Sequence, residues 1–198
     1  ILSPAEGSAA ERVLAAVGAQ TPVLLFNREL GGNLPEYAHW DRLMLDNQHG
    51  ARLATEHLIA QGHKRIAFFG GHSDSSSCRQ RHAGYVEAMN AAGLPIAPRW
   101  RVETMPTRMD AARACAELFA AKPAPTAAVC YNDAVALGLM LGLNQRGIQP
   151  GRDFALTGFD DIAEAAFSMP PLTTLATDPR ARGRQAAQLL LARLRKPQ

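Results

Sequence analysis

Short apolar runs alternate with longer segments of helical composition along most of the chain, and this alternation limits the possible folds more than any other feature. The runs expected to form buried strands are Val23–Phe26, Arg42–Leu45, Arg65–Phe69, Trp100–Glu103, Thr126–Cys130 and Asp153–Thr157. Most of the segments between them are roughly ten to fifteen residues long, the length of a crossover between parallel strands. The sequence therefore predicts an α/β fold in which parallel sheets are flanked by helices.

The expected helices have recognisable ends and contacts. Asp46 is placed to cap one helix and Gly62 to close it. Gly138 and Gly142, one turn apart, predict a close contact between two helices. The last helix is expected to bury Ala187, Leu190, Leu191 and Leu194. The helices are predicted over Ala9–Val17, Asp46–Ala60, Cys78–Ala92, Met109–Ala120, Asn132–Arg146 and Pro179–Leu194, with a short one over Ile162–Phe167.

The bulk composition is that of a soluble globular protein. With 198 residues, 47% hydrophobic and 20% charged, the chain can form one large domain or two small ones. The net charge of +3 is small, and the one basic run, 180–196, is expected to be the solvated face of a helix rather than a nucleic-acid surface. The longest apolar stretch, Ala134–Leu143, is about half of what a bilayer crossing needs, so no membrane contact is expected.

The cysteines and the start of the chain bear on its compartment and extent. Cys78, Cys115 and Cys130 are odd in number and show no CxxC spacing, which favours a reducing cytoplasm. No signal-peptide pattern is present at the start. The chain begins at Ile1 without Met, as if at the end of a strand, and we expect that an upstream portion precedes it.

Motifs of the common enzyme and cofactor classes are missing. There is no GxGxxG, no GxxxxGK[ST] and no GxSxG, and the six histidines form no zinc-ligand pattern. A catalytic triad stays open on spacing alone, because its members need not be close in sequence. No predicted strand end brings an acid, a base and a nucleophile together, so we expect neither an enzyme nor a cofactor or metal.

Polar side chains gather where the predicted strands end. The adjacent carboxylates of Asp160 and Asp161 could form a catalytic pair, a metal site, a helix cap or a hook for a polar ligand. An arginine and asparagines follow other strands, which favours the polar ligand. In open parallel sheets ligands bind outside the carboxyl ends of the strands, and those positions carry Asn27-Arg28, Gly70–Arg81, Met105-Pro106, Tyr131–Asp133 and Phe159–Asp161.

Seven short motifs occur along the chain in the order found in one protein family. They are Pro22–Arg28, Leu45–Asn47, Gly62–Gly71, Arg79–Tyr85, Asn132–Gly138, Thr157–Asp161 and Pro170–Thr174. Together they resemble the effector-binding domain of LacI/GalR-type transcription regulators over nearly the whole chain. The resemblance implies the periplasmic-binding-protein type of fold, with two α/β lobes around a cleft. Residues 1–45 and 176–198 would form the first lobe, incomplete here, and 46–175 the second.

The resemblance also implies a function. The chain would be the effector-sensing and dimerising part of a cytoplasmic DNA-binding regulator, expected to be a repressor. A small polar effector, most simply a sugar but also a purine or another metabolite, would bind in the cleft and change operator binding. A helix-turn-helix domain upstream would read the DNA, and a second copy of the chain would complete a homodimer. The alternative is a periplasmic solute-binding protein of a transporter, which shares the fold.

Two residues match the family's ligand contacts most directly. Asp160 matches the carboxylate that accepts hydrogen bonds from the effector, whereas Asp161 is expected to start the following helix. Arg81 matches the cleft arginine, whose planar fork can hold two ligand oxygens. The alternative for Arg81 is that it only pairs with Asp160. Arg79 is expected to point elsewhere on the helix.

The resemblance extends the site to four further residues, some of which have a plainer interpretation. Asn132 would reach the ligand or only cap a helix. Asn27 and Arg28 would approach the ligand from the first lobe. Ser77, in the loop before the helix of Arg81, could donate to the effector or only fill the loop.

Overall fold

The computed structural model describes residues 16–17, 21–27, 39–120 and 122–195. The chain divides into two compact units, a larger one of residues 46–177 and a smaller one that combines 1–45 with 178–198. That these units are the two lobes of the family fold stays a prediction.

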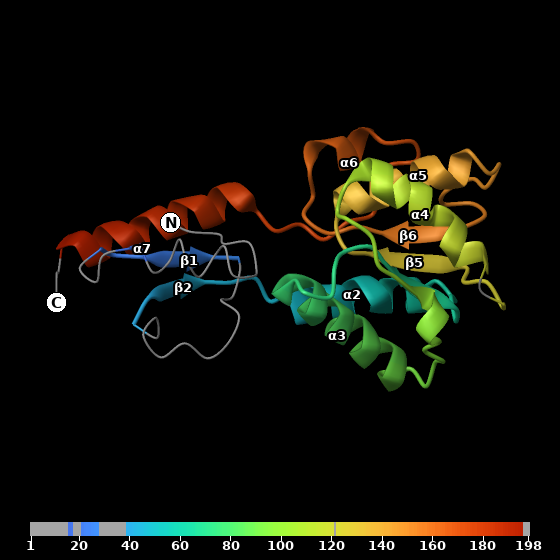
Figure 1. The fold of residues 1–198 in the computed structure, drawn as a ribbon, viewed down its shortest axis with the longest axis horizontal. Coiled ribbons are helices and arrows are strands. Elements are labelled where there is room, and N and C mark those ends of the chain that lie inside the picture. Colours follow the sequence, from blue (N-terminus) through green and yellow to red (C-terminus); the bar gives the residue numbers. More distant parts are fainter. Residues whose placement is uncertain (1–15, 18–20, 28–38, 121, 196–198) are drawn as a thin grey trace. The chain divides into compact units, whose positions relative to one another are not determined.

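The larger unit is built on a parallel sheet of four strands in the order β4-β3-β5-β6 (Figure 1). Its strands are β3 (Ile66–Phe69), β4 (Arg101–Val102), β5 (Ala127–Cys130) and β6 (Ala155–Thr157). β3 and β5 are buried at every position, as their unbroken apolar sequences predict for strands covered on both faces. The predicted parallel α/β class is confirmed, and the carboxyl ends of the four strands lie at one edge of the sheet.

Two pairs of helices cover the two faces of this sheet (Figure 1). One pair is α2 (Asn47–Ala60) with α3 (Ser76–Ala91), and the other is α4 (Arg108–Ala120) with α5 (Asp133–Asn144). A Cβ at Gly138 of α5 would overlap the carbonyl of Arg108 in α4, and one at Gly142 would overlap Cys115. The predicted helix contact at these two glycines is therefore confirmed. A 3-10 turn, η2 (Pro98–Trp100), and a short helix, α6 (Ala163–Phe167), complete the larger unit.

One hydrophobic core holds the sheet and its helices together. Leu58, Phe68, Leu118 and Phe154 come from both faces of the sheet and are almost completely buried. The hydroxyl of buried Tyr85 donates to the carbonyl of Ile66 at 2.8 Å, so its polar atom is satisfied inside the core. The core fixes the positions of the strand ends and of the polar loops that follow them.

The smaller unit contains two parallel strands, β1 (Leu24–Phe26) and β2 (Asp41–Leu43), and the last helix, α7 (Pro179–Arg195). The predicted buried face of α7 is largely wrong. Leu191 and Leu194 are 52% and 54% exposed, and Ala187 is exposed as well. Ala186 is the buried residue, and Leu190 is half-buried.

Two arginines explain why α7 buries a different face from the predicted one. Arg182 near its start donates to Asn27 Oδ1 at 2.5 Å, and Arg193 near its end lies 3.2 Å from Asp41 Oδ2. Both arginines share one helix face with Ala186. These polar contacts turn that face toward the strands and leave the leucines of the neighbouring face outside, which hydrophobic periodicity alone does not reveal.

The predicted helix ends are found with small shifts. Asp46 caps α2 as predicted, because its Oδ1 accepts the N–H of His49 at 2.9 Å. α3 begins earlier than predicted, so Ser77 lies in the helix and not in the loop before it. The predicted helix over Ala9–Val17 falls almost entirely outside the described residues.

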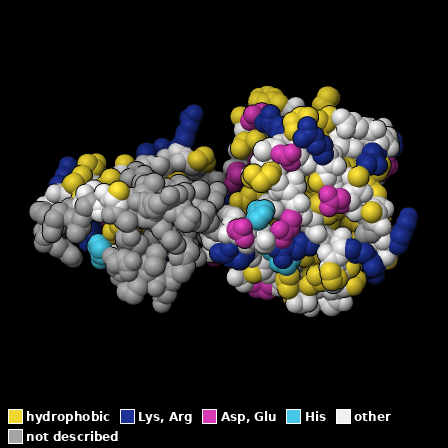
Figure 2. Space-filling model, viewed as in Figure 1, with side chains coloured by type: hydrophobic (Ala, Val, Ile, Leu, Met, Phe, Trp, Pro, Cys, Tyr) yellow, Lys and Arg dark blue, Asp and Glu magenta, His cyan; other side chains and the backbone are white. Residues whose placement is uncertain are grey.

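Three further features concern the composition of the described residues. All three cysteines are free and buried. No helix in the described ranges combines the length and the apolar character that a membrane span needs. On the face shown in Figure 2, the Lys and Arg side chains of the larger unit are interspersed with acidic and apolar ones and do not gather in one patch.

Candidate ligand-binding site

Arg81 is the buried centre of a contact network at the carboxyl edge of the larger sheet. It lies on α3, which follows β3, and only 6% of it is exposed. Its Nε donates to Asn47 Oδ1 at 2.9 Å, and its Nη1 donates to the carbonyl of Tyr131 at 2.6 Å. Its guanidinium also lies over the ring of Phe159, 3.6 Å from the ring centroid. Arg81 thus joins the start of α2 to the ends of β5 and β6.

Asp160 faces this arginine from the loop after β6. Asp160 Oδ1 lies 3.6 Å from Arg81 Nη2, an ion pair that is too long for a hydrogen bond, and its side chain is 36% exposed. Burial raises the pKa of Asp160; the Arg81 charge lowers that pKa and the Asp133 charge raises it. Within the described part of the chain, the carboxylate accepts no hydrogen bond. The described residues therefore leave the hydrogen-bond acceptor capacity of this carboxylate unused.

The backbone of Asp160 is held in an unusual conformation. Its φ is +119°, in the region that favours glycine. Its N–H donates to the carbonyl of Leu175 at 2.9 Å, and its own carbonyl accepts the hydroxyl of Thr177 at 3.2 Å. Such strain persists only where the surroundings fix the conformation, and it is found most often at functional sites.

Asp133, the first residue of α5, positions the loop that carries Asp160. It is fully buried, its Oδ2 accepts the N–H of Ile162 at 2.9 Å, and its Oδ1 accepts the hydroxyl of Thr174 at 2.5 Å. A Cβ at Gly158 would overlap Asp133 Oδ1, so only glycine permits this approach. Burial raises the pKa of Asp133, although the hydrogen bonds from Thr174 and Ile162 act to lower it.

Asp161 does not start the following helix, so that prediction is wrong. α6 begins at Ala163, and Ile162 occupies the position before it. The N–H of Ile162 donates a hydrogen bond to Asp133 Oδ2, which belongs to a different helix, α5. Asp161 itself is exposed and has a φ of +59°.

Asn132 and Ser77 have structural partners of their own. Asn132 caps α5, because its Oδ1 accepts the N–H of Val135 at 2.9 Å. The Ser77 hydroxyl is buried and lies 2.9 Å from both the Tyr131 hydroxyl and Ser75 Oγ. Ser77 thus contacts Tyr131, whose carbonyl accepts from Arg81, and Asn132 is the next residue in the chain. The contact of Asn132 and Ser77 with a ligand stays a prediction.

Asn27 belongs to the smaller unit and Arg28 lies outside the described residues. Asn27 has a φ of +61°, and its side chain accepts a hydrogen bond from Arg182. The structure therefore assigns Asn27 a structural partner, and the predicted ligand contacts of Asn27 and Arg28 are not tested.

The sequence did not identify the residues that hold Arg81 in place. Asn47 and Phe159 lie inside motifs that carry the resemblance, but these motifs do not reveal what the two residues do. Tyr131 contributes its backbone carbonyl, which no side-chain pattern can reveal. Asp133 also lies inside one of these motifs, and only its burial and the hydrogen bonds that it accepts from Ile162 and Thr174 show what it does.

Comparison with known proteins identifies the family. The family model of the periplasmic binding protein-like domain matches residues 55–198. The chain belongs to this family. The HTH-type transcriptional repressor PurR of Vibrio parahaemolyticus is 37% identical over 161 residues, which cover 81% of this chain and 48% of that protein. The chain thus spans about half the length of the curated relatives it matches.

Solved structures of LacI-family proteins share the fold. A regulatory protein of the LacI family from Chloroflexus aggregans is 30% identical with a TM-score of 0.83, over 96% of this chain and 66% of that one. A LacI-family transcriptional regulator from Enterococcus faecium with bound ribose is 26% identical with a TM-score of 0.79, over 89% of this chain and 63% of that one. The predicted resemblance to the LacI-type effector-binding domain is confirmed.

Proposed function

We propose that this domain senses a small polar effector through Asp160 and Arg81, and that the regulator carrying it changes its DNA binding in response. The observation that carries the proposal is the Asp160 carboxylate. It is held 3.6 Å from a buried arginine and, within the described residues, accepts no hydrogen bond. An ionised carboxylate can accept several hydrogen bonds, so this group suits a ligand with hydroxyl or amine donors.

A sugar is the effector class that suits this pair best. A hydroxyl group both donates and accepts, so one hydroxyl can donate to Asp160 while its neighbour accepts from Arg81 Nη2. The ribose bound to the Enterococcus faecium regulator supports this class. A purine or another polar metabolite is the alternative.

The relatives support a repressor over a periplasmic solute-binding protein. Two Vibrio relatives, from Vibrio campbellii and Vibrio parahaemolyticus, are 36% and 37% identical and are named as HTH-type transcriptional repressors. We therefore propose that the whole protein reads an operator through a helix-turn-helix domain and has no enzymatic activity. Effector binding would shift the equilibrium between two conformations that differ in DNA affinity.

A thermal-shift screen against monosaccharides, disaccharides and nucleobases tests the effector class, because a ligand of the folded state raises its apparent stability. Calorimetry with the ligand found then compares the wild type with Asp160→Asn. We expect Asp160→Asn to weaken binding by about 1–3 kcal/mol, the range for a hydrogen bond to a charged group. Asp161→Asn is the matched control, because it removes the adjacent exposed carboxylate, and it should leave the affinity unchanged. Equal affinity in the wild type and Asp160→Asn would remove Asp160 from the site.

We also propose that the domain forms a homodimer through an apolar surface around α6. Phe167 and Met169 are 85% and 89% exposed. Glu164 of α6 pairs with Arg108 of α4 at 2.8 Å, and Met109, next in α4, is 57% exposed. Exposed apolar side chains grouped in this way often mark protein interfaces.

Analytical ultracentrifugation tests this surface. The wild type should sediment as a dimer and Phe167→Ser as a monomer. The control is Leu53→Ser, which replaces a leucine of α2 that is 41% exposed, and this variant should remain dimeric. A dimer in Phe167→Ser, or a monomer in the wild type, would contradict the proposed surface.

A further inference from the structure

β6 leaves one short stretch of the sheet edge open. It is the last strand in the order of the sheet, so one of its sides faces no other named strand of the described residues. On the β5 side, the N–H of Ala155 donates to the carbonyl of Thr126. On the other side, the N–H of Gly158 donates to the carbonyl of Thr173. Because backbone groups alternate along a strand, the N–H and C=O of Leu156 point to the open side.

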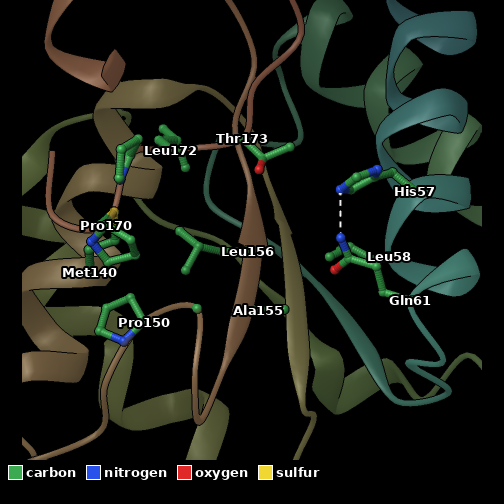
Figure 3. A pocket seen from close by; sticks show the side chains of 12 residues that line it. His57, Leu58, Gln61, Met140, Pro150, Ala155, Leu156, Pro170, Leu172 and Thr173 are labelled. Atoms are coloured by element: carbon green, nitrogen blue, oxygen red, sulfur yellow. Dashed lines mark hydrogen bonds between the residues drawn. The ribbon is translucent and has the colours of Figure 1, made fainter. Parts of the chain in front are cut away.

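A partly open hollow of about 220 Å³ lies at this edge. Figure 3 shows His57 of α2 and Gln61, just after the end of α2, on one side of β6, and Met140, Leu172 and Pro150 on the other. Leu156 lies between them in the same view. No Asp, Glu, Lys or Arg of the described residues lines the hollow. It contains neither Arg81 nor Asp160, so it is separate from the proposed effector contacts.

Both ends of the open edge are closed by the chain itself. Before β6, the N–H of Gly151 donates to the carbonyl of Phe154, and after it Gly158 bonds to Thr173. Leu156 is therefore the single residue of β6 that offers its backbone outward. An extended peptide binds an edge through several residues in succession, and the edge of β6 has no such length. The occupant has to be a small molecule.

We propose that this hollow binds a small uncharged molecule with a cis amide in an apolar ring, such as a lactam. A cis amide presents its N–H and C=O on one side, where the N–H and C=O of Leu156 can each form a hydrogen bond with it. The apolar ring would lie against Leu58, Met140 and Leu172, which line the hollow. A cavity of about 150 Å³ already holds one benzene ring, so the volume is sufficient.

The uncharged lining determines the class of ligand. Burying a charge without a partner is costly, which excludes acids and amines in their ionised forms. Gln61 Nε2 and His57 Nε2 lie 3.0 Å apart at the rim, so they largely satisfy each other and do not require a charged ligand. The ligand's polar contacts therefore come mainly from the edge of β6.

A nuclear magnetic resonance titration of the ¹⁵N-labelled chain with δ-valerolactam tests the proposal. We expect saturable shifts at the amides of Leu156 and Thr173. N-methyl-δ-valerolactam has a similar ring and carbonyl but no N–H donor, so it should bind at least about tenfold more weakly. Equal binding of the two lactams, or no saturable shift at Leu156 up to the solubility limit, would overturn the proposal.

Two tryptophan variants locate the binding. Gln61→Trp places a large side chain at the rim and should abolish the shifts caused by the lactam. Ala60→Trp is the matched control, because Ala60 is the neighbouring exposed residue of α2 and does not line the hollow. It should leave the lactam affinity unchanged. Undiminished binding in Gln61→Trp, or equal loss in both variants, would contradict the assignment.

Discussion

The variant Asp160→Asn distinguishes a ligand-binding carboxylate from a structural one. If Asp160 mainly neutralised Arg81, its removal would leave a buried cation unpaired and cost about 3–5 kcal/mol of unfolding free energy. The structure argues against this neutralising role, because the two charged groups are 3.6 Å apart and Arg81 already donates to Asn47 and Tyr131. Burial raises the pKa of Asp160, so its ionised form is less favourable in the folded than in the unfolded chain.

The expected change in stability is small and positive. The Asp160 side chain is 36% exposed, so solvent screens much of the electrostatic effect. We expect Asp160→Asn to change the unfolding free energy by between zero and about +1 kcal/mol at pH 7. For a chain of this size this corresponds to a Tm increase of at most about 4 °C. The backbone adds no cost, because Asn tolerates the φ of +119° as Asp does.

The pH dependence of this difference follows from the direction of the pKa shift. A raised folded-state pKa means that Asp160 contributes stability below its unfolded-state pKa, about 3.9, and loses that contribution as the pH rises through the folded-state pKa. The advantage of Asp160→Asn over the wild type should therefore be present at neutral pH and shrink as the pH falls toward about 4.

Thermal denaturation at several pH values measures the difference. Asp153→Asn is the opposite control, because hydrogen bonds from Arg152 and the N–H of Gln149 lower the pKa of Asp153 to about 2. Asp153 thus contributes stability above its unfolded-state pKa, and its replacement should lower the Tm at pH 7. A loss of about 3 kcal/mol or more in Asp160→Asn at pH 7 would refute the reasoning.

The structure determines the direction of the stability change for four further substitutions. Thr157→Val should gain about 1 kcal/mol of unfolding free energy, because the buried Thr157 Oγ1 has no hydrogen-bond partner among the described residues. Thr55→Val should lose about 1 kcal/mol, because the equally buried Thr55 hydroxyl donates to a backbone carbonyl at 2.7 Å. Urea denaturation measures both, and equal signs would contradict the argument. Gly158→Ala should lose at least about 2 kcal/mol through overlap with Asp133. Gly183→Ala, in α7 with no atom within 4 Å of its added Cβ, should instead gain up to about 1 kcal/mol, and a loss there would argue against that reading.

The fold of the larger unit could be predicted because its local patterns agree with its packing. β3 and β5 are unbroken apolar runs in the sequence and are buried on both faces in the sheet. Asp46 both matches the capping pattern and caps α2. Gly138 lies where two helices approach too closely for a side chain. In each case one short segment contains the information that determines the structure.

Features that depend on distant partners could not be predicted in this way. The rotation of α7 depends on Arg182 and Arg193, whose partners lie more than a hundred residues earlier in the chain. The role expected of Asp161 is filled by Asp133, which reaches the Asp160 loop from another helix. Pairwise contacts of this kind leave no periodic pattern in the sequence.

The two charged residues of the candidate site, Arg81 and Asp160, differ in how strongly the rest of the protein holds them. Arg81 donates hydrogen bonds through Nε and Nη1 to Asn47 and Tyr131 and lies against the ring of Phe159. Its replacement by alanine would therefore destabilise the fold as well as weaken ligand binding. Asp160 makes no hydrogen bond through its carboxylate within the described residues, so its replacement should mainly remove the proposed ligand contact. Selectivity for the ligand should therefore depend on the ligand's hydrogen-bond donors more than on its acceptors.

For a sugar effector, a deoxy analogue that lacks the hydroxyl group donating to Asp160 should bind the wild type more weakly. The same analogue should lose little further affinity in Asp160→Asn, because the partner of that hydroxyl is already changed. Additive losses in the analogue and the variant would show that the hydroxyl and Asp160 do not meet.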